Sequence, residues 1–323
     1  MRVLVTGANG FVGRHTVHDL QQAGHTVSGF DLTTSPATLP ALDIHTGDIQ
    51  DKDAVNEVVA KTRPEACVHL SAISFVPEGW RNPEALFSIN LLGTIHLLEA
   101  FRRQAPDARI LVVSSAEVYG LRPRPRPVQE DDLLDPDNPY AISKAAADRL
   151  ALLYARQHGL KVMTVRPYNH IGPGQDPRFV VASFAVQLAA IAHGQANACG
   201  QANACGQAPA IIKVGNLDSR RDFSDVRDVA RAYRLLLEHG RQGLAYNLCS
   251  QQTTTIRAIL DQLCDLSGAH PAVEVDPLRY RPVGKRPDLD TTRIETDIHW
   301  KPEITLRATL RDILTEATHT IRT

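Results

Sequence analysis

The segment TGANGFVG (6–13) constrains the fold more than any other part of the sequence. Gly7, Gly10 and Gly13 follow one another at three-residue spacing, between an apolar strand predicted at 2–6 and a helix predicted at 11–23. Glycine at these positions permits a tight turn and a close approach of the backbone to a pyrophosphate, which the positive end of the helix stabilises. A GxxGxxG pattern is weak alone, but the flanking strand and helix strengthen it. We therefore predict a dinucleotide-binding turn whose contact residues are Gly7, Gly10, Phe11, Val12 and Gly13.

Strands and helices alternate through the first half of the chain. The predicted strands are 2–6, 25–31, 42–49, 65–72, 109–115 and 160–167, and the predicted helices are 11–23, 51–62, 83–104 and 140–158. This alternation is typical of a parallel sheet that is covered by helices on both faces. The predicted fold class is α/β, with a Rossmann-type doubly wound parallel sheet.

The second half of the chain is less regular. Helices are predicted at 179–194, 225–238, 255–266 and 306–317, and strands at 210–216 and 244–250. We expect a second, smaller mixed α/β domain that binds substrate. The expected domains are 1–168, to which 217–243 returns, and 169–216 with 244–323, the latter containing a loop insertion at 195–206.

The net charge of −1 gives no global field that favours nucleic acid or an anionic membrane. We also find no apolar run of the length that a membrane span needs. Neither a nucleic acid nor a membrane is therefore expected as a partner. The five cysteines are an odd number without a CxxC pair, which argues against a disulfide framework and favours a cytoplasmic location.

Asp31 ends the second predicted strand, where an acidic residue accepts hydrogen bonds from an adenosine ribose diol. The following LTTSPATLP contains no Arg or Lys to pair with a 2′-phosphate, so NAD(H) is favoured over NADP(H). The alternative is that Asp31 only caps a loop. Asp48 and Ile49 are expected to flank the adenine, and Leu70 and Ala72 complete the predicted cofactor contacts.

The segment YAISK places Tyr140 and Lys144 four residues apart, on one face of a helix. A neighbouring ammonium favours the phenolate, so we expect Lys144 to lower the pKa of Tyr140. Such a tyrosine can exchange a proton with a carbonyl or an alcohol. Ser115, at the end of the fifth predicted strand, can bind the same substrate oxygen. YxxxK is also common on helix surfaces, but the upstream dinucleotide turn favours a catalytic pair.

At these residues the chain resembles the extended short-chain dehydrogenase/reductase family. The resemblance covers essentially the whole chain and rests on TGANGFVG, SSAEVYG (114–120), YAISK, RPYNHIGPG (166–174) and RRDFSDVRDV (220–229). It implies a Rossmann-type domain that binds NAD(P). It also implies that Tyr140 is the general acid/base, that Lys144 holds the nicotinamide ribose and that Ser115 polarises the carbonyl.

A narrower resemblance rests on NHIGPGQ (169–175), VGNLDSRRDFSDVRD (214–228), AYNLCS (245–250) and WKPEITL (300–306). These segments are similar to GDP-4-keto-6-deoxy-D-mannose reductases, which form GDP-D-rhamnose. The resemblance implies NAD(P)H-dependent reduction of the C4 ketone of a nucleotide sugar. It further implies a homodimer formed by helices 83–104 and 140–158. The substrate-binding residues that it implies are Asn169, Val180, Arg221 and Arg281.

Glu117 keeps a GDP-mannose 4,6-dehydratase open as an alternative. In dehydratases a glutamate at this position removes the proton beside a transient ketone. Glu117 can instead order the substrate or the loop, and Ala116 supplies no acid that helps water leave. A related epimerase and a non-catalytic dinucleotide sensor are further alternatives. The intact Tyr140 and Lys144 argue against the sensor.

The hexamer QANACG occurs twice, at 195–200 and 201–206. Cys199 and Cys205 supply two soft ligands and His193 a third, whereas a closed zinc site needs four. We therefore expect no metal site. Small residues and glycine indicate a surface loop. The fold should tolerate the insertion, because a longer loop costs only about 0.6 kcal/mol per doubling of its length. Deletion of 195–206 is expected to preserve the fold and most of kcat.

Overall fold

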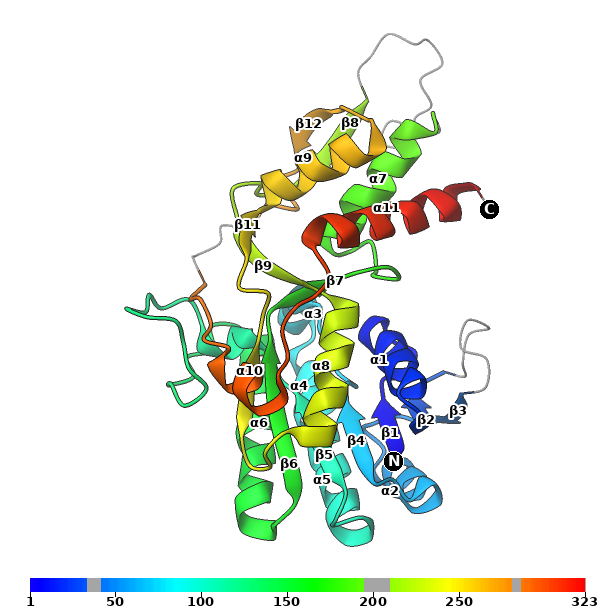
Figure 1. Cartoon of the computed structure of the whole chain (residues 1–323), viewed down its shortest axis with the longest axis vertical. Coiled ribbons are helices and arrows are strands. Elements are labelled where there is room, and N and C mark those ends of the chain that lie inside the picture. Colours follow the sequence, from blue (N-terminus) through cyan, green and yellow to red (C-terminus); the bar gives the residue numbers. More distant parts are fainter. Residues whose placement is uncertain (34–41, 195–209, 281–285, 323) are drawn as a thin grey trace. The chain divides into compact units, whose positions relative to one another are not determined.

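The computed structural model describes residues 1–33, 42–194, 210–280 and 286–322 (Figure 1). The chain forms two compact units. The first unit comprises Met1–Tyr168, Arg227–Cys249 and Arg286–Lys301, and the second unit comprises Asn169–Val226, Ser250–Lys285 and Pro302–Thr323.

The first unit is built on a seven-stranded parallel sheet of order β10-β6-β5-β4-β1-β2-β3. Its strands are β1 (Arg2–Thr6), β2 (Thr26–Asp31), β3 (Asp43–Thr46), β4 (Ala66–His69), β5 (Arg109–Val113), β6 (Lys161–Pro167) and β10 (Ala245–Leu248). The sheet runs outward from β1 in both directions, as in a doubly wound dinucleotide-binding fold. The predicted fold class is confirmed.

Helices cover both faces of this sheet (Figure 1). They are α1 (Phe11–Gln22), α2 (Lys52–Thr62), α3 (Val76–Arg81), α4 (Pro83–Phe87), α5 (Gly93–Gln104), α6 (Pro139–His158), α8 (Val226–His239) and α10 (Thr292–Ile298), with a π-helical turn η1 (Ser88–Leu92) and a 3-10 turn η2 (Ala116–Tyr119). Alternate side chains of a strand point to opposite faces. Val3 and Val5 accordingly pack with α1 and α8, whereas Leu4 packs with α2 and α5.

The second unit has its own hydrophobic core between helices and two small sheets. One sheet has the order β11-β9-β7, and the other pairs β12 with β8. The elements are β7 (Asn169–Ile171), α7 (Val180–Ala192), β8 (Ile211–Val214), β9 (Arg220–Asp225), β11 (Thr253–Thr255), α9 (Ile256–Ser267), β12 (Ala272–Val275) and α11 (Leu306–Arg322). Phe184, Ile259 and Leu310 are buried where α7, α9 and α11 pack together.

The observed units differ from the expected domains in three places. Residues 217–226 lie in the second unit because β9 pairs with β7 and β11. Residues 244–249 lie in the first unit because β10 extends the large sheet beside β6. A further return, 286–301, contributes α10 to the first unit.

The segment 83–104 is long and apolar enough to cross a membrane by length and composition, contrary to the expectation from the sequence. A buried core helix passes the same test, and 44% of its most apolar window is buried. Leu97, Leu98 and Phe101 of this segment belong to the core beneath the sheet.

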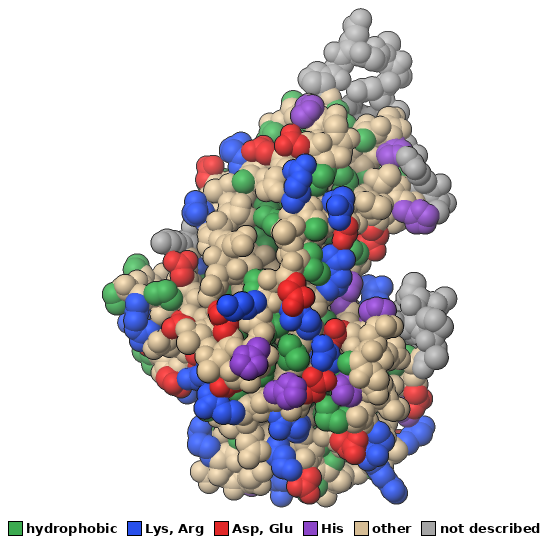
Figure 2. Space-filling view, in the orientation of Figure 1, with side chains coloured by type: hydrophobic (Ala, Val, Ile, Leu, Met, Phe, Trp, Pro, Cys, Tyr) green, Lys and Arg blue, Asp and Glu red, His purple; other side chains and the backbone are tan. Residues whose placement is uncertain are grey.

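On the face shown in Figure 2, Lys and Arg side chains are interspersed with Asp and Glu among the described residues.

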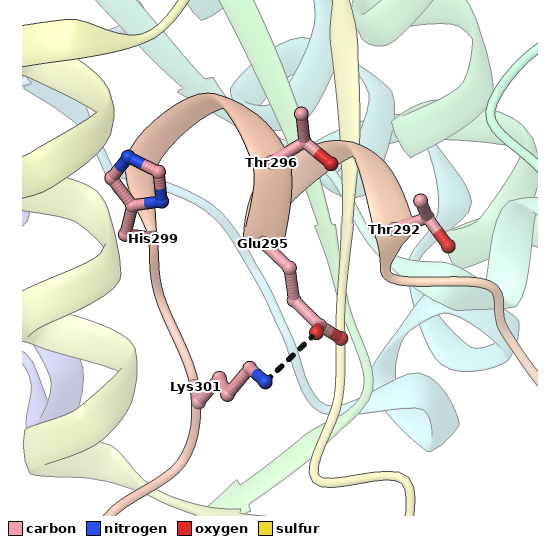
Figure 3. A pocket seen from close by; sticks show the side chains of 5 residues that line it. All are labelled: Thr292, Glu295, Thr296, His299 and Lys301. Atoms are coloured by element: carbon pink, nitrogen blue, oxygen red, sulfur yellow. Dashed lines mark ion pairs between the residues drawn. The ribbon is translucent and has the colours of Figure 1, made fainter.

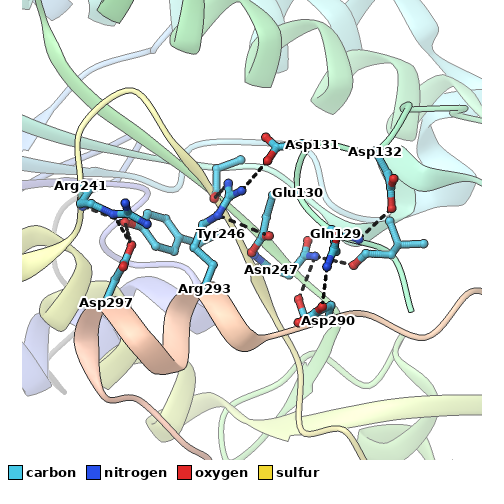
Figure 4. Close-up of polar contacts among 12 residues, drawn as sticks. Gln129, Glu130, Asp131, Asp132, Arg241, Tyr246, Asn247, Asp290, Arg293 and Asp297 are labelled. Carbon is cyan, nitrogen blue, oxygen red and sulfur yellow. Dashed lines mark hydrogen bonds and ion pairs between the residues drawn. The ribbon is translucent and has the colours of Figure 1, made fainter. Parts of the chain in front are cut away.

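The Pro-rich segment 121–129 is predicted to be a loop, and its end and the residues that follow it are fixed against the edge strand β10 (Figure 4). The Asn247 backbone N–H donates to Glu130 Oε1 over 2.9 Å, and the Asn247 side chain donates to the Val128 carbonyl over 2.8 Å. Arg293 of α10 forms two ion pairs with this stretch: its Nε lies 3.5 Å from Glu130 Oε2, and its Nη2 lies 2.6 Å from Asp131 Oδ2. These contacts hold the segment that follows η2.

Candidate active site

The glycine turn between β1 and α1 has the geometry of a phosphate cradle. Gly7 has φ +69°, and its N–H donates to the Phe30 carbonyl over 2.8 Å. A Cβ atom on Gly13 would lie 2.1 Å from the Gly7 carbonyl oxygen and 2.7 Å from that of Ala8. Among the described residues, no side chain caps the N-terminus of α1, whose first turn carries no acidic residue. The turn therefore fits a dinucleotide pyrophosphate at the helix N-terminus.

Asp31 lies at the C-terminal end of β2, beside this turn. Its Oδ2 accepts the Asn9 N–H over 2.9 Å, and its Oδ1 accepts the Leu32 N–H over 2.8 Å. Asp31 therefore caps the turn and holds a carboxylate at the strand end. The segment 34–41, which contains most of the stretch without Arg or Lys, lies outside the described residues.

The remaining predicted cofactor residues lie around the same sheet edge. Phe11 and Val12 open α1. Asp48 accepts hydrogen bonds from the backbone and side chain of Gln50. Ile49 is 5% exposed and belongs to the core. Leu70 and Ala72, which follow β4, are half-buried.

A buried polar chain that the sequence patterns did not reveal runs from this turn to the helix α6. His69 Nδ1 lies 2.8 Å from Thr6 Oγ1, and its Nε2 lies 3.0 Å from Thr94 Oγ1. Thr94 donates to the carbonyl of Asn90 in the π-helical turn, and Asn90 donates to Ser143 Oγ of α6 over 3.0 Å. Burial, with the nearby Lys144, lowers the pKa of His69 to about 3, so its ring is neutral. π-Helical turns often mark functional sites.

Ser115, Tyr140 and Lys144 come together at the C-terminal end of β5. Ser115 caps η2 by accepting the Glu117 N–H and acts on Tyr140 by lowering its pKa, and Lys144 Nζ donates to the Val113 carbonyl over 2.8 Å. All three side chains are at least nine-tenths buried. Asn138 caps α6 through the Ala141 N–H over 2.9 Å, and Pro139 occupies the first turn. The cap fixes the start of the helix that carries Tyr140.

The expected lowering of the Tyr140 pKa is wrong for this structure. Burial raises the pKa of Tyr140, and the charge of Glu117 raises it further, against smaller lowering effects of Ser115 and Arg286. Desolvation disfavours the Tyr140 phenolate more than the charge of Arg286 favours it. Burial also lowers the pKa of Lys144 to about 8. Tyr140 is therefore protonated at neutral pH and can act as an acid.

Two residues near Glu117 are missed by the sequence patterns. Arg286 Nη2 lies 3.0 Å from Glu117 Oε1, and Asn138 Nδ2 donates to Glu117 Oε2 over 3.0 Å. Arg286 Nη1 is buried and makes no hydrogen bond within the described part of the chain. Arg281, the arginine expected from the resemblance, lies outside the described residues. Only the distance to Glu117 distinguishes Arg286 from the other arginines of this stretch.

The second unit holds the other predicted substrate residues. Asn169 in β7 pairs with Phe223 in β9, and its side chain donates to the Asp222 carbonyl over 3.3 Å. Arg221 is therefore on the strand beside Asn169. Val180 begins α7 and is 37% exposed.

A separate cavity of about 320 Å³ lies on α10 (Figure 3). Its lining contains an ion pair of 3.6 Å between Lys301 and Glu295 and none of the predicted site residues. In the described part of the chain, no three His, Cys, Asp or Glu side chains form a group suited to a metal ion. Cys199 and Cys205 lie outside that part.

Comparisons with known proteins agree with this geometry. The model of the NAD dependent epimerase/dehydratase family matches residues 3–249. The chain belongs to this family. It is 38% identical to the GDP-6-deoxy-D-mannose reductase of Pseudomonas aeruginosa, over 98% of this chain and 96% of that protein. It is 32% identical to a dTDP-glucose 4,6-dehydratase of Streptomyces niveus, over 94% of this chain and 89% of that protein.

Two solved structures of the family resemble this fold closely. RMD from Pseudomonas aeruginosa, complexed with NADPH, is 36% identical and superposes with a TM-score of 0.85, over 99% of both chains. The UDP-glucose 4-epimerase of Thermus thermophilus in complex with NAD is 28% identical, with a TM-score of 0.84, over 98% of this chain and 99% of that chain.

Proposed function

We propose that this chain is a nucleotide-sugar oxidoreductase that reduces the C4 ketone of GDP-4-keto-6-deoxy-D-mannose to give GDP-D-rhamnose, with NAD(P)H as reductant. The observation that carries the proposal is the buried group of Ser115, Tyr140 and Lys144. This group lies in the same unit as the glycine turn. The full-length similarity to a GDP-6-deoxy-D-mannose reductase supports the choice of substrate.

The bound dinucleotide supplies the hydride for this reaction. Side chains of this protein bind the ketone oxygen and supply the proton that it takes up. Ser115 donates a hydrogen bond to the ketone oxygen and orients it toward Tyr140. Tyr140, whose raised pKa keeps it protonated, gives its proton to the oxygen as negative charge develops there. Lys144 holds the ribose next to the nicotinamide, and its position is fixed by the Val113 carbonyl.

A preference for NAD(H) over NADP(H) is the finer part of this proposal. Asp31 is held by two backbone N–H groups at the end of β2, where its fixed negative charge would repel a 2′-phosphate. RMD was solved with NADPH, so the two cofactors have to be compared directly. We expect kcat/KM to be higher with NADH than with NADPH. We expect Asp31→Ser to reduce the ratio of these two kcat/KM values. An unchanged ratio in Asp31→Ser would show that Asp31 does not set the preference.

The decisive experiment measures oxidation of NADH or NADPH with GDP-4-keto-6-deoxy-D-mannose and identifies the product by NMR. Tyr140→Phe is the matched control, because it removes only the phenolic oxygen. A parallel incubation with GDP-mannose and no added NADH separates the reductase from the 4,6-dehydratase. Dehydration in that incubation, without reduction of the ketone, would refute the proposal. The relevant substrate contacts are proposed at Asn169, Val180, Arg221 and Arg281.

We also propose a homodimer and a cytoplasmic location. Ile142 and Leu153 of α6 are 44% and 40% exposed, and they lie eleven positions apart, close to three helical turns. They therefore share one exposed apolar stripe, with Leu92 of η1 as a further exposed apolar residue. Such a stripe suits a helical contact with a second subunit. Light scattering of the purified protein tests the subunit number.

A further inference from the structure

Glu117 is held from two sides at the start of the candidate site. Its Oε1 faces Arg286 Nη2 at 3.0 Å, and its Oε2 accepts the Asn138 amide at 3.0 Å. Arg286 and Glu117 are only 16% and 19% exposed. Hydrogen bonds to ionised groups are among the stronger ones in proteins, and breaking one inside a site leaves a partner unsatisfied. Glu117 is therefore an anchored carboxylate.

Asn138 connects this carboxylate to the helix of Tyr140. Its Nδ2 donates to Glu117, while its Oδ1 accepts the Ala141 N–H over 2.9 Å and caps α6. One side chain therefore sets the position of Glu117 relative to the first turn of α6, which contains Tyr140.

Several titratable or charged groups surround Tyr140. Glu117 comes from η2, Arg286 from the segment before α10, Tyr233 from α8, and Lys144 from the next turn of α6. Glu117 raises the pKa of Tyr140 and Arg286 lowers it. The two members of the ion pair thus act on Tyr140 in opposite directions.

A free carboxylate in this place has an unwanted chemistry available. Hydrogens on the carbons that flank a ketone are acidic, because the electron pair of the broken C–H bond passes to the ketone oxygen and forms an enolate. The proton moves to the carboxylate, which then releases it to solvent. A proton from solvent adds to the carbon as the electron pair returns from the enolate oxygen, and the ketone is restored. This cycle needs no oxidant, but it exchanges the hydrogen and can invert the carbon. A ketone reductase has to suppress it.

We propose that Arg286 and Asn138 clamp Glu117 as a fixed counter-ion beside Tyr140 and so prevent this carboxylate from acting as a base on the carbons that flank the substrate ketone. Arg286 and Asn138 are then positioning residues that determine reaction specificity. The inference rests on the proposed ketone reduction. It adds that this chain keeps the glutamate that it shares with dehydratases, and that Arg286 and Asn138 prevent that glutamate from acting as a base.

The test measures deuterium uptake from D2O into GDP-4-keto-6-deoxy-D-mannose. The full-length protein is saturated with the oxidised dinucleotide, so that no reduction occurs, and the label is located by NMR. We expect slow uptake with the wild type. Arg286→Gln should accelerate it by roughly 10- to 100-fold, the range that follows from loss of one hydrogen bond to a charged group. Arg286→Lys should restore slow exchange, and Arg286→Gln combined with Glu117→Gln should abolish the gain.

Arg241→Gln is the matched control, because Arg241 belongs to the same unit and pairs with Asp297 at 2.7 Å, away from Glu117. It should exchange at the wild-type rate. Exchange by Arg286→Gln at the wild-type rate, with binding of the ketone retained by calorimetry, overturns the clamp. Equal exchange by the single and double variants also overturns it, because the base would then not be Glu117.

The two proposals fail in different ways. A wild type that binds the ketone without reducing it refutes the proposed function, yet the exchange comparison between variants remains valid. A wild type that reduces the ketone, together with unchanged exchange in Arg286→Gln, refutes the clamp alone. A wild type that does not bind the ketone refutes both.

Discussion

Substitution of Asp148 by asparagine is expected to destabilise the first unit strongly. Asp148 in α6 and Arg166 in β6 form an ion pair of 2.8 Å whose side chains are 0% and 1% exposed. Arg166 Nε and Nη2 donate to the two carboxylate oxygens, and its Nη1 donates to Tyr119 Oη and to the Glu130 carbonyl, each over 2.7 Å. The pair thus joins α6 and β6 to the end of η2 and to the segment that follows it.

The size of the expected loss in the free energy of unfolding follows from the charge of Arg166, which stays buried when Asp148 is replaced. Removing one member of a buried ion pair costs about 3–5 kcal/mol, because the other charge remains desolvated without compensation. Asparagine keeps one acceptor for the guanidinium, so we expect a loss near the lower end, about 3 kcal/mol, for Asp148→Asn. Arg166→Met combined with Asp148→Leu leaves neither charge of this pair buried without its partner. It still removes the donor to Tyr119 and Glu130, at about 1–3 kcal/mol for each unsatisfied group.

The assay is urea unfolding followed by tryptophan fluorescence. Both tryptophans, Trp80 and Trp300, lie in the first unit, so this signal reports on that unit. Asp148→Leu, Arg166→Met and the variant that combines them form a cycle, in which the double variant should lose clearly less than the sum of the two single variants. Additive losses, or a loss below about 1 kcal/mol for Asp148→Asn, would refute the uncompensated-charge argument.

Further predictions concern the site and its surroundings. Burial lowers the pKa of Lys144 to about 8, so its ammonium is lost as the pH rises through that value. NADH affinity, measured by fluorescence, should therefore weaken above about pH 8. In Lys144→Met the affinity should no longer depend on pH in this range. Because a lysine in the unfolded chain titrates at about pH 10.4, the lowered pKa of Lys144 should make the free energy of unfolding rise between about pH 8 and that value. Tyr140→Phe should lower kcat by about 10²- to 10⁴-fold while NADH still binds; turnover close to wild type would remove Tyr140 from the chemistry. Gly13→Ala should abolish NADH binding in the same titration, because its Cβ would lie 2.1 Å from the Gly7 carbonyl oxygen. Leu153→Asp should give a monomer in light scattering if the exposed stripe of α6 forms the dimer contact.

The large sheet was predictable because its evidence is local. Each of the strands β1, β4 and β5 is a short apolar run, and helices of adequate length separate the strands. The strand β9, RRDFSD, gave no such signal. Its Asp222 is buried and accepts the Ser250 N–H over 2.8 Å, and its Asp225 accepts the Thr309 hydroxyl over 2.7 Å. A polar strand that is satisfied by distant partners looks like a surface loop in the sequence, and this misplaced one domain boundary.

The same limit explains which parts of the candidate site could be predicted. The spacing of Tyr140 and Lys144 follows from one turn of one helix, so the sequence is sufficient to place them together. The pKa of Tyr140 depends on burial beneath several elements and on Glu117, and its direction was therefore predicted wrongly.

Glu117 itself shows why motif chemistry is incomplete without the fold. The sequence left open whether this carboxylate removes a proton or only orders its surroundings, because the sequence does not show which groups the carboxylate contacts. The structure adds an arginine from a distant segment and an asparagine that caps α6, both at 3.0 Å from Glu117. A base has to accept a proton and release it, whereas a carboxylate held by a guanidinium and an amide must first give up those bonds. The partners of a carboxylate, rather than its presence, therefore decide its chemistry, and a reductase can keep the glutamate of a dehydratase as long as the clamp holds.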